Sequence, residues 1–496
     1  MNVIMVIFDS LRKDCISCLG SPPWGVVKTP HIDKFAKESF VINNCYPESL
    51  PTLPARRAIY TGNRVYPFWE DWKLKGDFVG APGWGPILEN QFTISEILQQ
   101  HGYTTALIAD VPHIFKPSKN FHRGFDEWIW VRGYETDCYR SGPEPSDEEV
   151  DYWLPKEIKN ADEYEYTFYV NFIKKGLMNA QERKREEDYS VAKVMRESVR
   201  WLEQNIDREN KFLLIESFSP HEPWFVPLYY RKKYIKDGYP QQVISIYNET
   251  NLIPDEIIRS TQANYSGLVT MCDRWFGYLM ESIKNMGLLN DTLLVVTTDH
   301  GHSIGDNNYL GKRGYPSSPE VFDIPIFIRH PENELNRGVK SDILVQHTDI
   351  LPTILDIIGI DPIVRDFNQQ NNLEDKGLSD NDKIRINFHG KSFFKNLVTK
   401  NKFREHLTIG WGAAVTVVNN DWWFNSRING KGVFLYNLKE KFPFKKNLSD
   451  ENPEIVKELF DIAVYDGGGK FPDYLLKMAE NEEDAPGCSQ LAVKDF

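Results

Sequence analysis

Four apolar segments, each followed at once by polar residues, constrain the fold of this 496-residue chain more than any other feature. They span residues 2–8, 103–109, 212–218 and 292–298, and most of their side chains are apolar. Runs of this length and composition are typical of strands that are buried on both faces of a parallel sheet. The pattern therefore predicts an α/β fold. Because ligands bind beyond the carboxyl ends of such strands, the polar residues that follow are candidate site residues.

Acidic residues and histidines follow these apolar runs. Asp9 comes directly after the first run, and Asp299 and His300 come directly after the fourth. Carboxylate oxygens and an imidazole at the end of a buried strand suit a divalent metal ion. An aspartate in this position also caps turns, so a purely structural role for Asp9 is the alternative.

Residues 49–62 indicate a loop that turns into a helix. Pro54 suits a first helical position, where its missing N–H costs nothing. The hydroxyl of Thr52 would then lie at the helix N-terminus, where free N–H groups and the helix dipole favour negative charge. Arg56 follows four residues later and can reach the same end. Together these groups predict an anion site with a nucleophile.

This stretch resembles the signature of the sulfatase family in the alkaline phosphatase superfamily. The signature is Cys or Ser, any residue, Pro, any residue, Arg, with Thr-Gly five and six residues after the arginine. In that register Thr52 takes the nucleophile position, and Arg56 is followed by Thr61-Gly62. The resemblance implies a mixed, mostly parallel sheet sandwiched by helices, with a smaller C-terminal α+β subdomain.

Threonine at the nucleophile position bears on the substrate. Sulfatases convert their Cys or Ser to formylglycine, and Thr52 cannot give the same aldehyde hydrate. Superfamily members with an unmodified threonine act mainly on phosphorus. The resemblance therefore implies an ester hydrolase similar to phosphodiesterases and phosphonate monoester hydrolases, cleaving a phosphate mono- or diester. A sulfate ester is the main alternative, and a phospho-transferase or a binding homologue without catalysis is another.

The same resemblance implies one divalent metal ion, held by Asp9, Thr52, Asp299 and His300. Sulfatases carry a second aspartate where this chain has Ser10, so that ligand is in doubt. An imidazole ligand favours Mn²⁺ or Zn²⁺, with Ca²⁺ or Mg²⁺ as alternatives. Relatives with two zinc ions need an Asp-x-x-x-His pair, which occurs nowhere in this chain, so we expect one ion.

The resemblance also assigns residues to the substrate anion. Arg56, His221 and Lys312 match family positions around the tetrahedral group, and His113 matches a histidine on the leaving-group side. The alternative for His221 is a structural role. Asp110 stands where sulfatases have a lysine, so the charge is reversed. Asp110 would either face a cationic part of the substrate or cap the following turn.

The chain divides into two predicted domains. Residues 1–385 form the catalytic α/β domain, in which the charged stretch 134–190 is an insertion that could act as a lid. Residues 386–496 form the C-terminal subdomain, with a small antiparallel sheet and a helix. Its strands are expected at 414–418, 422–424 and 433–438, and its helix at 453–463.

Two further features have alternative interpretations. The tryptophan-rich loop 64–91 would wall a substrate pocket or pack on the fold, and the sequence favours neither. His347 would support the metal ligands from behind, although a packing role is the preferred interpretation.

Composition narrows the function classes. The net charge of −13 argues against broad nucleic-acid binding. No apolar run approaches 18 residues, and the N-terminal run is too short for a signal peptide. The six cysteines lack a disulfide-rich pattern. We therefore expect a soluble cytoplasmic enzyme for a small-molecule ester, without nucleic-acid or membrane partners, and compatible with a homo-oligomer.

Overall fold

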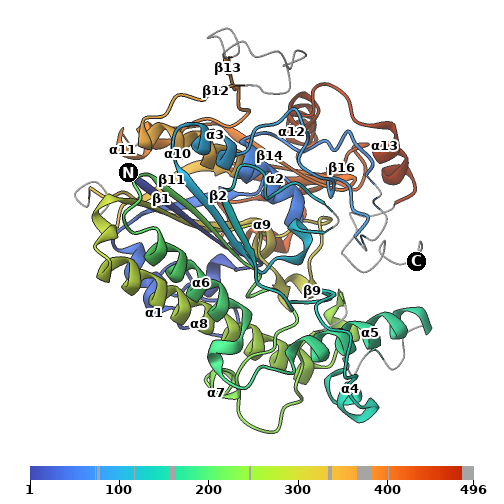
Figure 1. Cartoon of the computed structure of the whole chain (residues 1–496). Coiled ribbons are helices and arrows are strands. Elements are labelled where there is room, and N and C mark those ends of the chain that lie inside the picture. The colour runs from blue at the N-terminus through green and yellow to red at the C-terminus, as the bar shows by residue number, and fades with distance from the viewer. Residues whose placement is uncertain are drawn as a thin grey trace.

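An eight-stranded sheet forms the centre of the protein (Figure 1). Its strand order is β11-β2-β10-β7-β1-β5-β3-β4, and within it β10 runs antiparallel to both neighbours while the other pairings are parallel. The strands are β1 (Asn2–Phe8), β2 (Phe40–Tyr46), β3 (Thr104–Ala109), β4 (Glu127–Trp130), β5 (Lys211–Ser217), β7 (Thr292–Thr298), β10 (Ile324–Arg329) and β11 (Lys340–Gln346). The predicted α/β fold and its four buried strands are confirmed.

The computed structural model describes residues 1–72, 74, 77, 79–116, 118–155, 158, 163–244, 247–332, 338–365, 383–399 and 401–482. Its helices are α1 (Pro30–Ala36), α2 (Thr52–Thr61), α3 (Ile94–Gln100), α4 (Asp147–Trp153), α5 (Glu163–Ala180), α6 (Ser190–Gln204), α7 (Leu228–Arg231), α8 (Asp255–Asn285), α9 (Pro319–Phe322), α10 (Ile350–Ile358), α11 (Phe394–Thr399), α12 (Pro453–Asp466) and α13 (Asp473–Glu480). None of the described helices is long and apolar enough to cross a membrane.

Alternating side chains of the central strands fill two separate hydrophobic cores. In β1, Val3, Met5 and Ile7 point to one face of the sheet, and the residues between them point to the other. The first core includes residues of α2, α3, α10 and α11, and the second includes residues of α1, α6 and α8. The sheet is thus covered by helices on both faces, as Figure 1 shows, and strand ends are the places left for a site.

A second sheet follows near the C-terminus. Its strands β14 (His406–Trp411), β15 (Ala414–Asn419), β16 (Trp422–Arg427) and β17 (Phe434–Asn437) pair antiparallel in chain order. One face packs against α12 and α13 through Val415, Val417 and Phe424. The other packs against the main domain, where Trp411 and Trp423 contact Phe322. The predicted antiparallel sheet and helix are present, and β14 and α13 are additions to that prediction.

Smaller elements complete the fold. β6 (Asn248–Glu249), β9 (Tyr309–Gly311) and β8 (Ser303–Ile304) form a three-stranded sheet, and β12 (Ile363–Arg365) pairs with β13 (Lys383–Arg385). Within 134–190, α4 and α5 share a hydrophobic cluster of their own with Val243 and Ile244. These residues form a helical unit, whereas the lid role stays a prediction.

One local prediction at α2 was wrong. Thr52 is the first helical residue and Pro51 precedes it as the N-cap, so Pro54 is the third helical residue rather than the first. Proline is tolerated there because the N–H groups of the first turn have no partner within the helix. The shift places Thr52 itself at the helix N-terminus.

Candidate active site

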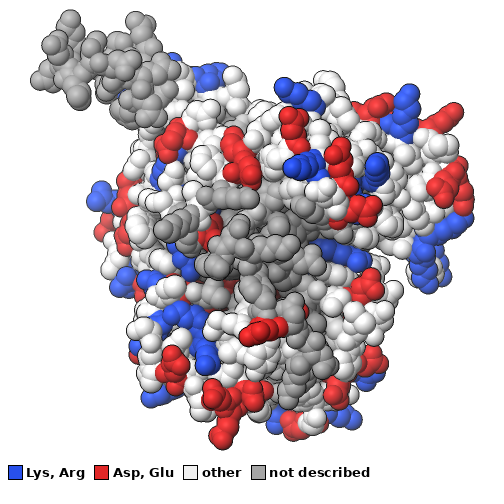
Figure 2. All heavy atoms as spheres, turned by 90° about the vertical axis from the view of Figure 1, so that its right-hand side faces the viewer, with Lys and Arg blue, Asp and Glu red and all other residues white. Residues whose placement is uncertain are grey.

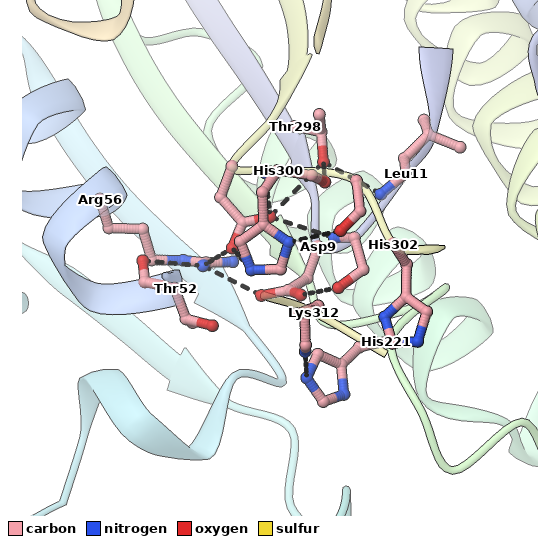
Figure 3. Close-up of polar contacts among 12 residues, drawn as sticks. Asp9, Leu11, Thr52, Arg56, His221, Thr298, His300, His302 and Lys312 are labelled. Carbon is pink, nitrogen blue, oxygen red and sulfur yellow. Dashed lines mark hydrogen bonds and ion pairs between the residues drawn. The ribbon is translucent and has the colours of Figure 1, made fainter. Parts of the chain in front are cut away.

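Two neighbouring strands bring the first site residues together. β1 and β7 pair in parallel with Phe8 opposite Thr298, so Asp9 and Asp299 leave the sheet side by side. Asp9, Asp299 and His300 are fully buried, and one ligand atom of each lies within 4.8 Å of the others. Figure 3 shows Asp9 and His300 close together at the centre of the site. These predicted metal ligands therefore form one cluster.

Ser10 orients this cluster. Its hydroxyl donates to Asp9 Oδ1 over 2.8 Å, and its backbone N–H donates to Asp299 Oδ1 over 3.0 Å. The residue has a φ of 60°, in the left-handed region, where a serine needs local support. Ser10 therefore links the two carboxylates, rather than adding the second carboxylate of the family pattern.

Arg56 forms three ion pairs with buried carboxylates. Its Nη1 lies 3.0 Å from Asp9 Oδ2 and 2.5 Å from Asp299 Oδ2, and its Nε lies 2.9 Å from Glu216 Oε2. Burial raises the pKa of Asp9 well above its usual value, and the Asp299 charge adds to this. Burial also opposes ionisation of Asp299, but His300 and Arg56 hold the Asp299 pKa below its usual value.

Glu216 was missed by the sequence analysis. It is the sixth residue of β5, is fully buried, and accepts hydrogen bonds from Arg56 and from the Tyr60 hydroxyl. Burial raises the Glu216 pKa, while Arg56 opposes that rise. The available signal was an acidic residue inside an otherwise apolar run, because buried charges are almost always paired.

Thr52 lies next to Arg56 at the start of α2. The Arg56 guanidinium donates to the Thr52 carbonyl oxygen over 3.2 Å, and the Thr52 side chain is 2% exposed. Figure 3 shows Thr52 and Arg56 on one side of Asp9 and the pair of His221 and Lys312 on another. The predicted nucleophile, arginine and metal ligands are thus brought to one place.

His221 and Lys312 are in direct contact, with Lys312 Nζ 2.6 Å from His221 Nε2. His221 Nδ1 lies 2.6 Å from the backbone oxygen of Glu222. Because a carbonyl can only accept, Nδ1 carries the proton and Nε2 accepts from the Lys312 ammonium group. Burial lowers the His221 pKa to about 4, so the imidazole is neutral at pH 7.

His113 is paired with a buried glutamate and packs among aromatic rings. Its Nε2 is 3.1 Å from Glu135 Oε2, and its ring packs edge-on against Phe218 and Trp84. Phe218 in turn stacks on His221 at 4.1 Å. His113 is therefore linked to His221 through Phe218, and its place on the leaving-group side stays a prediction. Of the tryptophan-rich loop, Trp84 is buried and packs on the fold.

The interpretation of Asp110 as a cap of the following turn does not match the structure. Asp110 is fully buried and accepts the Phe218 N–H over 2.5 Å, which ties the end of β3 to the end of β5. The following 3₁₀ turn, Pro112–Ile114, has no side-chain cap. The contact between Asp110 and a cationic part of the substrate stays a prediction. Burial raises the Asp110 pKa to about 7.

His347 supports the end of β7. Its Nε2 lies 3.0 Å from the Thr298 carbonyl oxygen, directly before Asp299, and the side chain is fully buried. Burial lowers the His347 pKa to about 4. The residue is therefore more than a packing residue, because it holds the backbone that presents Asp299 and His300.

The residues present fit a divalent ion. His300 Nδ1 lies 2.8 Å from the Gly301 carbonyl oxygen, so that nitrogen carries the proton and Nε2 keeps its lone pair. His300 Nε2 is buried and lacks a hydrogen-bond partner among the described residues. An unprotonated imidazole nitrogen that lies beside two carboxylates is oriented as a metal ligand would be.

The chain matches the Sulfatase family over residues 1–360. This protein belongs to the sulfatase family. It is 24% identical over 417 residues to an arylsulfatase of Clostridium perfringens, covering 79% of this chain and 82% of that one. It is 23% identical over 394 residues to the multifunctional alkaline phosphatase superfamily protein PehA of Trinickia caryophylli, covering 72% and 74% of the two chains.

Solved structures agree on the sulfatase-like fold. The phosphonate monoester hydrolase of Agrobacterium radiobacter superposes with a TM-score of 0.65 at 16% identity, covering 94% of this chain and 95% of that one. The phosphonate monoester hydrolase of Silicibacter pomeroyi superposes with a TM-score of 0.64 at 17% identity, covering 98% of this chain and 96% of that one. The predicted family, fold class and ester-hydrolase class are confirmed, and this sulfatase-family hydrolase belongs to the alkaline phosphatase superfamily.

Proposed function

We propose that this enzyme hydrolyses a phosphate mono- or diester, or a phosphonate ester, through Thr52 and one divalent metal ion. The observation that carries the proposal is the position of Thr52, at the N-terminus of α2 and one turn before Arg56. An unmodified hydroxyl there matches phosphoryl transfer better than the formylglycine chemistry of sulfatases. Among the compared proteins, the phosphonate monoester hydrolases support the same choice.

Asp9, Asp299, His300 and the Thr52 hydroxyl would hold the metal ion. When bound, such an ion lowers the pKa of a coordinated hydroxyl and offsets the charge of a phosphoryl oxygen. Mn²⁺ or Zn²⁺ is the proposed species because one donor is an imidazole. The chain's own cation, Arg56, neutralises the two aspartates from the other side.

Arg56 and Lys312 are the proposed anion contacts. Three carboxylates engage Nε and Nη1 of Arg56, whereas its Nη2 is buried and lacks a hydrogen-bond partner among the described residues. Nη2 is therefore the donor available to a substrate oxygen. Donors fixed in advance and shielded from water stabilise the charge that develops in the transition state.

The reaction divides into two steps at phosphorus. The Thr52 hydroxyl first loses its proton to solvent. Its oxygen then forms a bond to phosphorus while the bond to the leaving oxygen breaks, and that oxygen takes a proton from the Lys312 ammonium group. Water then attacks the threonyl-phosphate, the bond between phosphorus and the Thr52 oxygen breaks, and one proton of the water goes to Lys312. This restores the ammonium group of Lys312 and the deprotonated Thr52 oxygen. His221, neutral and fixed by its Nδ1 hydrogen bond, holds Lys312 in place.

Sulfate ester hydrolysis is the second candidate. It is favoured by the arylsulfatase of Clostridium perfringens and by an N-acetylglucosamine-6-O-sulfatase of Bacteroides thetaiotaomicron, which is 23% identical over 401 residues. The same Arg56 and Lys312 contacts suit a sulfate group. Thr52 is the observation against it.

A small-molecule ester stays the proposed substrate. On the face shown in Figure 2, basic and acidic side chains are interspersed, without a broad basic region on the described part of that face. Nucleic-acid binding usually needs such a region. The cytoplasmic location and the homo-oligomer remain proposals.

One experiment separates the candidates. The metal-loaded enzyme is assayed with aryl phosphate monoesters, phosphodiesters, phosphonate esters and sulfate esters that share one leaving group. The proposal predicts the highest kcat/KM on a phosphorus ester, and a phosphoryl group on Thr52 in mass spectra of enzyme quenched during turnover. Preference for the sulfate ester, with unmodified Thr52, would favour the second candidate.

A further inference from the structure

A buried carboxylate lies beside the proposed leaving-group residues. Glu222 follows His221 directly and is 5% exposed. Its Oε1 lies 3.5 Å from Lys312 Nζ, and its Oε2 lies 3.5 Å from His221 Nδ1 and 3.7 Å from His302 Nδ1. A carboxylate so near an anion site repels the substrate, so its presence needs a reason.

The three-stranded sheet of β6, β9 and β8 brings the partners of Glu222 together at one end of its strands. Tyr247 precedes β6, Lys312 follows β9 and His302 precedes β8, and the antiparallel pairing places all three at the same end. The Tyr247 hydroxyl donates to Glu222 Oε1. Gly311 makes this packing feasible, because a Cβ at that position would lie 2.4 Å from the Tyr247 ring.

Glu222 is ionised in this environment. Burial opposes its charge, but His221 and Lys312 hold the pKa of Glu222 well below its usual value. Its negative charge therefore faces the Lys312 ammonium group before the reaction begins. A long lysine side chain loses rotamer freedom when it is fixed, and a hydrogen-bonded carboxylate supplies the stabilising contact.

We propose that Glu222 is a positioning residue, which holds Lys312 and His221 against the leaving oxygen and so determines how well esters with poor leaving groups are cleaved. The inference rests on the proposed function. Glu222 does not exchange a proton in the reaction. Lys312 donates the proton as the bond between phosphorus and the leaving oxygen breaks, and Glu222 keeps the ammonium group in line with that oxygen.

The test compares leaving groups across variants. A series of aryl phosphates from nitrophenyl, a good leaving group, to phenyl, a poor one, is assayed with the metal-loaded parent and Glu222→Gln. We expect Glu222→Gln to lose at least ~10-fold more kcat/KM on the phenyl ester than on the nitrophenyl ester, because poor leaving groups depend most on proton donation. An equal loss across the series would overturn the proposal.

A second variant keeps the test valid if Glu222→Gln does not fold. Tyr247→Phe removes one hydrogen bond to Glu222 and leaves the carboxylate in place. We expect this variant also to lose more kcat/KM on the phenyl ester than on the nitrophenyl ester, by a smaller factor than Glu222→Gln. An unchanged dependence in this variant would also count against the proposal.

The matched control is Asp273→Asn on α8. Asp273 is another buried carboxylate, but it accepts the N–H groups of His31 and Ile32 at the start of α1. The Asp273→Asn variant should have a lower free energy of unfolding than the parent, and its rates should depend on the leaving group as those of the parent do. A parent enzyme that turns over none of the esters would overturn the proposed function and this inference with it, whereas an active parent with an unaltered dependence in the variants overturns the inference alone.

Discussion

Arg56 and Glu216 form a fully buried ion pair, with Nε 2.9 Å from Oε2. The pair joins α2, which carries Thr52, to β5, whose end leads to His221. Because Nη1 of the same guanidinium contacts Asp9 and Asp299, one side chain fixes the nucleophile helix relative to three strand ends. The position of Thr52 therefore depends on the ion pairs between Arg56 and carboxylates at the strand ends, as well as on the packing of α2.

The first prediction concerns this ion pair. Glu216→Gln should lower the free energy of unfolding by about 3 kcal/mol, because a buried arginine loses one of its carboxylate partners. Thermal unfolding measures the loss. Activity should fall as well, since Arg56 then has less to hold its orientation. The control is Glu187→Gln, whose exposed carboxylate lies 3.4 Å from the exposed Arg185 and should matter little. Equal stability of both variants would argue against a structural role for the pair.

The second prediction concerns Thr52. Thr52→Ala should lose at least about a thousand-fold in kcat while one metal ion stays bound, because the nucleophile is removed and Asp9, Asp299 and His300 remain. Thr52→Ser should retain part of the activity, since its hydroxyl can take the same role.

The control for Thr52 lies on the same helix. Thr61 ends α2 and its hydroxyl donates to the Arg57 carbonyl oxygen over 2.7 Å, so Thr61→Ala tests helix integrity without removing the nucleophile. Activity of Thr52→Ala within a few-fold of the parent would show that Thr52 is not the nucleophile.

The sequence predicted those site residues that local patterns mark. Asp9, Asp299 and His300 each follow an apolar run, so the strand that positions them is visible in the sequence. Arg56 was placed by its spacing from a helix start. The starting residue of that helix was misjudged by two positions, because proline is compatible with the whole first turn.

The remaining site residues depend on tertiary contacts. Glu222 and His302 follow no motif that separates them from surface residues, and their meeting depends on the small sheet. A cap of the following turn was one of two interpretations of Asp110, but its hydrogen-bond donor is the N–H of Phe218 at a neighbouring strand end. The contact between Asp110 and Phe218 spans 108 residues of sequence, and spacing along the chain does not reveal it.

The third prediction concerns the metal. Chelation should abolish activity, and Mn²⁺ or Zn²⁺ should restore it better than Ca²⁺, because the His300 imidazole favours the softer ions. Metal analysis should find close to one ion per chain. His300→Ala should weaken Mn²⁺ or Zn²⁺ binding by at least about 100-fold, measured by calorimetry.

The control for the metal is another buried histidine. His330 stacks on Phe394 at 5.9 Å, away from the site, and His330→Gln should bind the metal like the parent. Full restoration of activity by Ca²⁺ alone, or two tightly bound ions per chain, would contradict the proposed site.

The fourth prediction concerns pH. Burial raises the Asp110 pKa from 3.8 to about 7, so between these values the folded protein binds more protons than the unfolded chain. Stability contributed by protonated Asp110 is therefore fully present below about pH 4 and is lost as pH rises through 7. Above pH 7 the buried carboxylate is charged, and although it accepts the Phe218 N–H it destabilises the fold.

Asp110→Asn should remove this dependence. The amide oxygen can still accept the Phe218 N–H, but the side chain no longer titrates. Relative to the parent, the variant should gain stability on going from pH 5 to pH 8, by a few kcal/mol since one pKa unit corresponds to about 1.4 kcal/mol. Denaturant unfolding at both pH values measures the difference. A constant difference between variant and parent across this range would mean that Asp110 is already ionised at pH 5, and that the charged carboxylate is better solvated at the end of β3 than its burial indicates.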